Sequence, residues 1–254
     1  MAIDFEELRG HISNMYSDVA RFPRAEFHFP TGRPLMEQLG YPSDVLDRIP
    51  KGAMESFAGV GYHFDLQPLR AGEHVLDIGS GAGSDVFYAA LAVGSEGSAT
   101  GLDMTERMLD KSRKNVEGGD FEHVRFEKGL AETLPFDDER FDAVTSNGVI
   151  NLTPVKPMVF EAIRRVLKPG GRLMFSDIVT GVELPDSVRE NCELWAECIG
   201  GAVQEQRYLA LIEQAGMKVE TVRHNDRYRF TKDSTIQAAD KFQVRSISIL
   251  AYRT

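Results

Sequence analysis

The sequence predicts an α/β fold in which a mostly parallel sheet is covered by helices on both faces. Two observations carry this prediction. From His74 onward, short apolar segments alternate with longer segments of helical periodicity, which is the pattern of a parallel sheet with crossover helices. The first apolar segment also leads into a glycine-rich turn that opens a helix, and the second ends in an acid, Asp103, as in folds with a nucleotide-type crevice.

The same periodicities place the individual elements. We expect seven strands, near residues 74–78, 98–103, 123–127, 141–147, 171–178, 217–223 and 243–252. We expect helices near residues 83–93, 105–117, 155–167, 186–200 and 204–215. Lys168-Pro169-Gly170-Gly171 is expected to end a helix and turn the chain into the next strand. A long connection over 225–240, with a short helix, joins the last two strands, and we expect the final strand to be antiparallel.

Residues 1–70 have a different pattern and are predicted to form an N-terminal helical cap, or lid, on a domain of residues 71–254. A helix is expected from Phe5 to about Arg21, followed by a loop rich in proline and aromatic residues. Short helical pieces follow near residues 34–39 and 42–49, where Pro34 and Pro42 suit a first turn. We expect this segment to cover the molecule that reacts in the crevice.

Composition and charge limit the classes of function. The chain has 254 residues, 42% of them hydrophobic and 27% charged, and its net charge is −10. This is the composition of a globular protein, and an acidic chain with no basic run is a poor binder of nucleic acid. Cys192 and Cys198 make no disulfide framework, and no segment has the features of a leader or a membrane span. We therefore expect a cytoplasmic protein with a small-molecule substrate and no metal, nucleic acid or membrane partner.

The glycine-rich turn is the most informative motif. It reads Asp77-Ile78-Gly79-Ser80-Gly81-Ala82-Gly83, with the spacing G-x-G-x-G and not the G-x-G-x-x-G of dinucleotide sites. An acid at Asp77 would repel a pyrophosphate but suits the ammonium of an amino acid. The backbone amides of the turn (Gly79, Ser80, Gly81, Gly83) could then hold the carboxylate of that amino acid. This combination predicts S-adenosylmethionine, although a tight turn that binds nothing has the same sequence.

Further cofactor contacts are expected along the same crevice. Asp103 would accept hydrogen bonds from the ribose hydroxyls, and Met104, the next residue, is also expected to contact the cofactor. The loop after the third strand, Gly129–Phe136, would cover the adenine through Leu130, Ala131 and Glu132, or would be a plain loop with a turn proline.

The fourth predicted strand ends in polar residues. Ser146, Asn147 and Asn151 leave the strand at the edge of the sheet where ligands bind. Asn147 and Asn151 are therefore expected near the cofactor and the group that accepts the methyl. Asparagine can equally cap a helix or satisfy the backbone of a loop.

Four segments carry a resemblance to a known family: Asp77–Gly83, Leu102–Thr105, Arg165–Gly171 and Ser176–Val179. In them the chain resembles the class I S-adenosylmethionine-dependent methyltransferases, which have a Rossmann-like, seven-stranded, mostly parallel sheet. Over about residues 40–216 it is similar to the arsenite methyltransferase family, through Leu39-Gly40-Tyr41, Val149–Leu152 and Cys198–Ala202. The resemblance implies methyl transfer from S-adenosylmethionine, with S-adenosylhomocysteine as the product.

The resemblance also identifies what this chain lacks. In the arsenite family three cysteines bind trivalent arsenic, and the matching positions here are Val60, Gly148 and Cys198. Soft trivalent arsenic needs several sulfur ligands. Cys192 is a poor substitute, because on one helix it lies about 240° from Cys198. The pattern therefore disfavours arsenite as the substrate.

Other residues are candidates for the reaction itself. The resemblance directs Tyr62, His63 and Phe64 toward the cofactor sulfur, and His63 is a candidate general base, although a lone histidine more often packs at a junction. Cys198 is a candidate catalytic residue or a small buried one, and Trp195 lies on the same helical face.

The function that these observations favour is methyl transfer from S-adenosylmethionine to a small molecule by in-line displacement. One alternative is an arsenite or related metalloid methyltransferase that uses Cys198 and external thiols. A second is a protein that binds S-adenosylmethionine without turning it over. A nicotinamide dehydrogenase is disfavoured by the glycine spacing and by Asp77.

Overall fold

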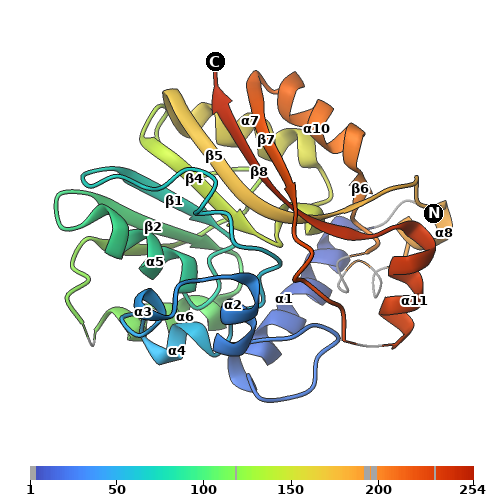
Figure 1. Ribbon diagram of the computed structural model, residues 1–254, viewed down its shortest axis with the longest axis horizontal. Coiled ribbons are helices and arrows are strands. Elements are labelled where there is room, and N and C mark those ends of the chain that lie inside the picture. Colours follow the sequence, from blue (N-terminus) through green and yellow to red (C-terminus); the bar gives the residue numbers. More distant parts are fainter. Residues whose placement is uncertain (1–3, 118, 192–194, 196–198, 232) are drawn as a thin grey trace.

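The computed structural model describes residues 4–117, 119–191, 195, 199–231 and 233–254. Its strands form one sheet in the order β3-β2-β1-β4-β5-β8-β7, and the short strand β6 pairs with the end of β5 (Figure 1). The strands are β1 (His74–Ile78), β2 (Ser98–Asp103), β3 (Val124–Lys128), β4 (Phe141–Asn147), β5 (Leu167–Thr180), β6 (Val203–Gln204), β7 (Met217–His224) and β8 (Arg245–Arg253). Only β8 runs against its neighbours β5 and β7. The mostly parallel sheet and its antiparallel last strand are confirmed.

Helices cover both faces of the sheet. One face carries α7 (Lys156–Val166) and α10 (Glu205–Gln214), whose apolar side chains belong to the same core cluster as Leu76 and Ile78 of β1. On the other face, α5 (Ser84–Val93) and α6 (Glu106–Val116) join a core cluster that includes Val75. Alternate residues of the buried strand β1 thus enter opposite cores, as the pleat requires. No helix among the described residues has both the length and the apolar character needed to cross a bilayer.

The order of the strands determines where a ligand can bind. The chain places β2 on one side of β1 and then, after β3, returns to place β4 on the other side, so the strand order reverses at β1. A crevice forms at such a switch point, outside the carboxyl ends of the parallel strands. Asp77, Asp103 and Asn147 lie at or beside the carboxyl ends of three adjacent strands, so the topology brings them together.

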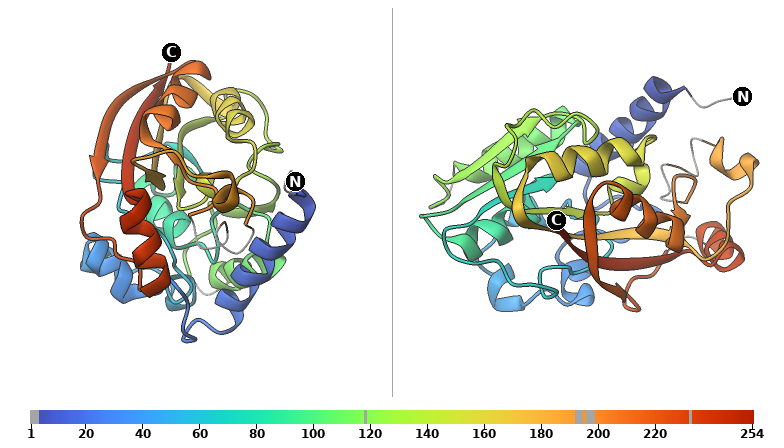
Figure 2. Two further views of the ribbon diagram at one scale, coloured as in Figure 1. Left: turned by 90° about the vertical axis from the view of Figure 1, so that its right-hand side faces the viewer. Right: turned by 90° about the horizontal axis from the view of Figure 1, so that it is seen from above.

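The N-terminal segment packs against the sheet domain. It contains α1 (Phe5–Arg21), α2 (Arg33–Leu39), α3 (Ser43–Leu46) and α4 (Lys51–Met54), which Figure 1 and the left view of Figure 2 show away from the C terminus. Asp4 caps α1 by accepting hydrogen bonds from the first-turn backbone. Leu8 and Ile12 of α1 belong to the same apolar cluster as Val86 and Phe87 of α5. The division at residue 70 stays a prediction.

Two predicted elements differ in extent, and the short strand β6 was not predicted. The helix expected over 186–200 is interrupted: α8 (Asp186–Arg189) ends where the Arg189 carbonyl accepts a hydrogen bond from the indole Nε1 of Trp195, 2.6 Å away. Strand β5 begins earlier than expected, because Leu167 already pairs with Phe141 and the glycines form an irregularity within the strand. α11 (Asp233–Phe242) is the helix expected in the last connection.

A buried ion pair joins β5 to the residue before β1, at the end of the sheet opposite the crevice. Arg172 on β5 donates to both carboxylate oxygens of Glu73, at 2.8 and 2.6 Å. Both side chains are largely buried, with 7% and 13% of their surface exposed. Removing one partner of such a pair leaves the other charge desolvated.

We predict that Arg172→Met lowers the free energy of unfolding by about 3 kcal/mol. Arg113→Met, which breaks an exposed pair with Glu106, should change it by less than about 1 kcal/mol. Urea unfolding of both variants measures the difference. Equal effects of the two substitutions would contradict the assigned role of the buried pair.

Candidate cofactor and acceptor site

One pocket lies at the switch point, between the sheet and the N-terminal segment. Its walls come from the glycine turn, the ends of β1, β2 and β4, the loop after β3, and α1. It contains ten of the eleven predicted cofactor residues: Asp77, Gly79, Ser80, Gly81, Asp103, Met104, Leu130, Ala131, Glu132 and Asn147. Gly83, the eleventh, caps α5 just below the pocket.

The glycine turn has no space for side chains at its first position. Gly79 has φ +72°, and a Cβ placed there would lie 2.2 Å from Cγ2 of Val149. The Val149 side chain therefore packs directly on the turn. Gly79 and Ser80 donate backbone hydrogen bonds to the Leu102 carbonyl, at 2.7 and 2.9 Å, which holds the turn against β2.

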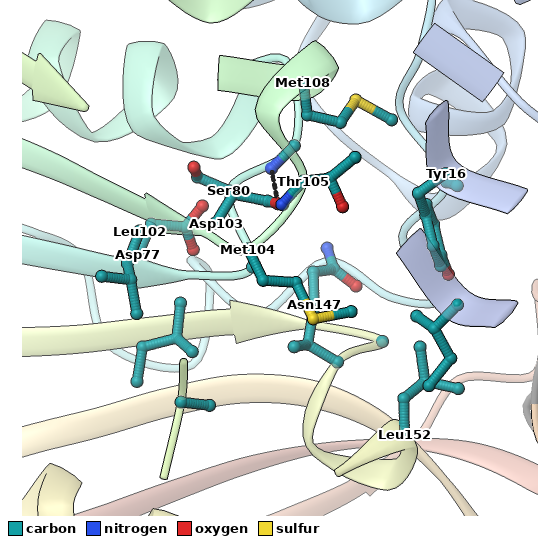
Figure 3. Close-up of a pocket in the computed structure, with 18 of the residues that line it drawn as sticks. Tyr16, Asp77, Ser80, Leu102, Asp103, Met104, Thr105, Met108, Asn147 and Leu152 are labelled. Carbon is teal, nitrogen blue, oxygen red and sulfur yellow. Dashed lines mark hydrogen bonds between the residues drawn. The ribbon is translucent and has the colours of Figure 1, made fainter. Parts of the chain in front are cut away.

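Asp103 connects the turn to α6. Its Oδ2 accepts a hydrogen bond from the Gly81 backbone at 2.8 Å, and its Oδ1 accepts one from Thr105 at 2.7 Å. Burial raises the pKa of Asp103, and these backbone donors act in the opposite direction. Figure 3 shows the carboxylate at the pocket wall beside Ser80 and Thr105. Each oxygen keeps a second lone pair for a ligand hydroxyl.

Two further carboxyl groups are buried in the same pocket. Asp77 accepts a hydrogen bond from the Thr145 hydroxyl at 2.7 Å. Asp85, in the first turn of α5, accepts from the Tyr41 hydroxyl at 2.7 Å and from Nδ2 of Asn147 at 3.0 Å. Both residues are only 4% exposed. Among the described lysines and arginines, none forms an ion pair with either group.

Burial controls the ionisation of this pair. It raises the pKa of Asp77 well above its usual range, and the charge of Asp85 raises it further. Burial also raises the pKa of Asp85 to about 6, although the hydrogen bonds from Tyr41 and Asn147 oppose the shift. A positively charged ligand group in the pocket would favour the ionised form of both acids.

Asn147 ties the N-terminal segment to the sheet. Its Oδ1 accepts from the Val60 backbone at 2.8 Å and its Nδ2 donates to the Gly61 carbonyl at 3.0 Å. The same amide nitrogen donates to Asp85 and to the Tyr41 hydroxyl. The side chain that was expected near the reacting methyl thus also fixes the position of the segment that precedes β1.

The opposite wall comes from α1. Arg9, Ile12 and Tyr16 line the pocket, and Figure 3 shows Tyr16 across from Met104 and Asp103. Arg9 also lies 3.3 Å from the buried carboxylate of Glu132 in the loop after β3. This ion pair connects α1 to the loop that was predicted to cover adenine.

Two predicted catalytic residues lie outside the pocket. His63 is fully buried, its Nδ1 lies 3.5 Å from the Ser176 hydroxyl, and burial lowers its pKa to about 3. His63 therefore does not line this pocket, because the histidine packs between the N-terminal segment and the sheet, and its role as a base stays a prediction. Asn151 is also fully buried and does not line the pocket. Cys198 lies outside the described residues.

The residues that sequence reasoning missed are Asp85 and the side chains of α1 and the 56–59 segment. Asp85 had a signal, an acid in the first turn of the helix that the glycine turn opens. Arg9, Ile12, Tyr16 and Phe57 had none, because their approach to the crevice depends on tertiary packing. Among the described residues, no group of three or more His, Cys, Asp and Glu side chains could hold a metal ion.

The pocket's chemistry fits S-adenosylmethionine. The buried carboxyl groups of Asp77 and Asp85 could pair with the ammonium, and Asp103 lines the pocket where it could bind a ribose. The buried Ser80 hydroxyl has no hydrogen-bond partner among the described residues. These features are those of proteins that bind a sulfonium nucleoside at the switch point of an α/β sheet.

The comparisons with known proteins identify the family. The methyltransferase domain family matches residues 69–216, and the chain belongs to it. S-adenosylmethionine is therefore its cofactor. An arsenite methyltransferase of Halobacterium salinarum is 39% identical over 75% of this chain and 48% of its own length. A 27-O-demethylrifamycin SV methyltransferase of Amycolatopsis mediterranei is 30% identical over 70% of this chain and 65% of its own.

A solved structure supports the same relationship. The crystal structure of an arsenic(III) S-adenosylmethionine methyltransferase from Chlamydomonas reinhardtii is 28% identical and superposes with a TM-score of 0.64. The match covers 88% of this chain and 74% of that protein. The chain spans less than half the length of the first curated arsenite methyltransferases that it matches.

We predict that Gly79→Ala abolishes detectable S-adenosylmethionine binding, because the new Cβ would displace Val149 from the turn. Gly94→Ala is the matched control, since Gly94 also has a positive φ of +66° but has no atom within 4 Å of the added Cβ. The control should cost about 1–2 kcal/mol of stability and keep its affinity. Isothermal titration with the cofactor measures both, and equal affinities would refute the packing argument.

Proposed function

We propose that this protein transfers the methyl group of S-adenosylmethionine to a small, predominantly apolar molecule. The observation that carries the proposal is one pocket with two chemically distinct ends. The end at the glycine turn contains buried carboxyl groups. The wall from α1 has Ile12 and Tyr16 beside Arg9, whose charge is paired with Glu132, and Phe57 and Leu152 add further apolar lining. A zwitterionic donor suits the first end, and a weakly polar acceptor suits the second.

The cofactor end holds its ligand by charge and by backbone donors. Asp77 and Asp85 would bind the ammonium, and Asp103 would accept the ribose hydroxyls. The loop with Leu130, Ala131 and Glu132 would cover the adenine. When bound, S-adenosylmethionine supplies an electrophilic methyl on a sulfonium.

The contribution of the chain to the reaction is position and exclusion of water. In-line displacement forms the bond between acceptor and methyl carbon as the bond to sulfur breaks, so the acceptor atom must lie opposite the sulfur. Val149, packed on Gly79, and the α1 side chains would hold the acceptor in that line and keep water out. His63 does not line the pocket, and burial lowers its pKa to about 3, which makes it a weak base, so the proposal gives it no role as the base.

A second candidate is transfer to trivalent arsenic or a related thiophilic element, with Cys198 and external thiols as ligands. The similarity to arsenite methyltransferases favours it. The described residues favour the first candidate. A Cβ at Gly148 would lie 3.2 Å from Cγ1 of Val60, so the two positions matched to family thiols adjoin and carry no sulfur here.

We predict that Asp85→Asn weakens binding of S-adenosylmethionine and S-adenosylhomocysteine by similar factors, about tenfold to a hundredfold, because both carry the ammonium. Titration calorimetry with each ligand measures the two ratios. A larger loss for S-adenosylmethionine alone would assign the carboxylate to the sulfonium, and no loss for either would contradict cofactor contact by Asp85.

Asp110→Asn, on the exposed face of α6, is the control for the change in net charge. The pH dependence gives an independent check. Since the acid must be ionised to attract a cation and its pKa in the free protein is about 6, the affinity of the unmodified protein should fall as pH drops below 6. The Asp85→Asn variant should lose part of this dependence.

We predict that the protein methylates an apolar phenol or enol from a panel of small molecules, and that Cys198→Ser leaves this activity intact. Transfer of a labelled methyl group, followed by mass spectrometry of the product, measures it. Trivalent arsenicals with glutathione form the parallel arm. Methylation of arsenic that is lost in Cys198→Ser would establish the second candidate and reject the first.

A further inference from the structure

The turn after β4 forms a wall of the pocket. It begins at Gly148 and includes the short helix η1 (Ile150–Leu152). Val149, Leu152, Thr153 and Pro154 line the pocket, and Val149 packs on Gly79. The position of this turn therefore determines the width of the acceptor end and its distance from the glycine turn.

A buried carboxylate holds the amide side of the turn. Asp177 on β5 is fully buried, and its Oδ2 accepts hydrogen bonds from the Asn151 backbone at 2.8 Å and from the Tyr208 hydroxyl at 2.6 Å. Its Oδ1 accepts from the backbone of Ile178 at 2.8 Å. Its own strand and α10 thus hold the Asp177 side chain in place, and the remaining hydrogen bond holds the turn at the Asn151 amide.

A buried ammonium holds the carbonyl side of the same turn. Lys156, at the start of α7, is 5% exposed and donates to the Asn151 carbonyl at 2.9 Å and to the Thr153 carbonyl at 3.0 Å. Its Nζ lies 5.3 Å from the centroid of the Trp195 ring. Space around the Asn151 carbonyl is closed on another side, since a Cβ on Gly201 would lie 2.1 Å from that oxygen.

We propose that Asp177 and Lys156 are positioning residues for methyl transfer, which together clamp residues 151–153 and so set the alignment of the acceptor with the methyl group. This inference rests on the proposed function. Hydrogen bonds to ionised groups are stronger than those between neutral groups, so a clamp of two opposite charges limits movement of the turn more than amides would. Misplacement of a reacting group by about 1 Å can lower a rate about a hundredfold.

The charge of Lys156 lies close enough to the Trp195 ring to affect its fluorescence. Burial lowers the pKa of Lys156 to about 8, while the negative charges of Asp177 and of Glu132 in the loop after β3 oppose the shift. Burial raises the pKa of Asp177 to about 6, against the hydrogen bonds from Tyr208 and the backbone and the charge of Lys156. Trp195 is the only tryptophan in the chain, so its fluorescence reports the charge state of Lys156 without interference from another indole.

The kinetic test compares substitutions in the clamp with one elsewhere on the same strand. Asp177→Asn and Lys156→Met should each lower kcat about tenfold to a hundredfold. Their affinities for S-adenosylhomocysteine should stay close to that of the unmodified protein, because Gly79 and Ser80 have their own bonds to Leu102. Lys156→Gln, which keeps a donor, should lose less than Lys156→Met.

Arg172→Met is the control, since it removes a buried charge from β5 away from the pocket. Its kcat, per folded molecule, should stay unchanged. The clamp is refuted if the Asp177 and Lys156 variants lose no more kcat than this control. It is equally refuted if their whole defect lies in cofactor affinity.

The fluorescence test does not depend on activity. The Trp195 emission of the unmodified protein should titrate with a midpoint near pH 8, and Lys156→Met should abolish that step. Asp177→Asn should move the midpoint to lower pH, because a negative charge that stabilises the ammonium is removed. An unmoved midpoint would refute the coupling of the pair. Absence of methyl transfer to every acceptor would reject the proposed function and leave this titration to decide the coupling separately.

Discussion

Burial of negative charge is the constraint on which the site depends. Asp77 and Asp85 have lost most of their water in one pocket, and no described cation pairs with either. Desolvation opposes their ionisation, and each charge opposes that of the other. A ligand with a positive group relieves both effects, whereas a pyrophosphate would add to them. The buried acids thus give the site an electrostatic basis for disfavouring a pyrophosphate.

The same carboxylates connect the ligand to the architecture. Asp85 shares hydrogen bonds with Tyr41 of the N-terminal segment and with Asn147 at the end of β4, and Asn147 holds the backbone at Val60 and Gly61. The segment before β1 is therefore attached to the sheet through polar groups that also line the pocket. Asp85 is thus linked to the N-terminal segment directly through Tyr41 and indirectly through Asn147.

Local patterns were sufficient for most of the fold, and they named residues that the structure brings together in one pocket. The glycine spacing, the acids at Asp77 and Asp103 and the strand periodicity are all features of neighbouring residues, and the structure has each where it was expected. His63 and Asn151 could not be placed in this way, because whether a polar side chain faces a pocket or a core is decided by segments far away in the chain. The interruption of the predicted helix at Arg189 is local by contrast: its carbonyl accepts a hydrogen bond from the indole of Trp195, six residues further along the chain.

The ion pair between Arg9 and Glu132 has a consequence for how ligands are exchanged. Helix α1 lines the proposed acceptor end, and its Arg9 forms an ion pair with the loop predicted to cover adenine. One helix therefore contacts both halves of the pocket. Movement of that helix would open the two halves in a single event. Spent nucleoside and methylated product would then leave through the same opening, and because Glu132 is buried, salt would weaken the ion pair that keeps it closed only slightly.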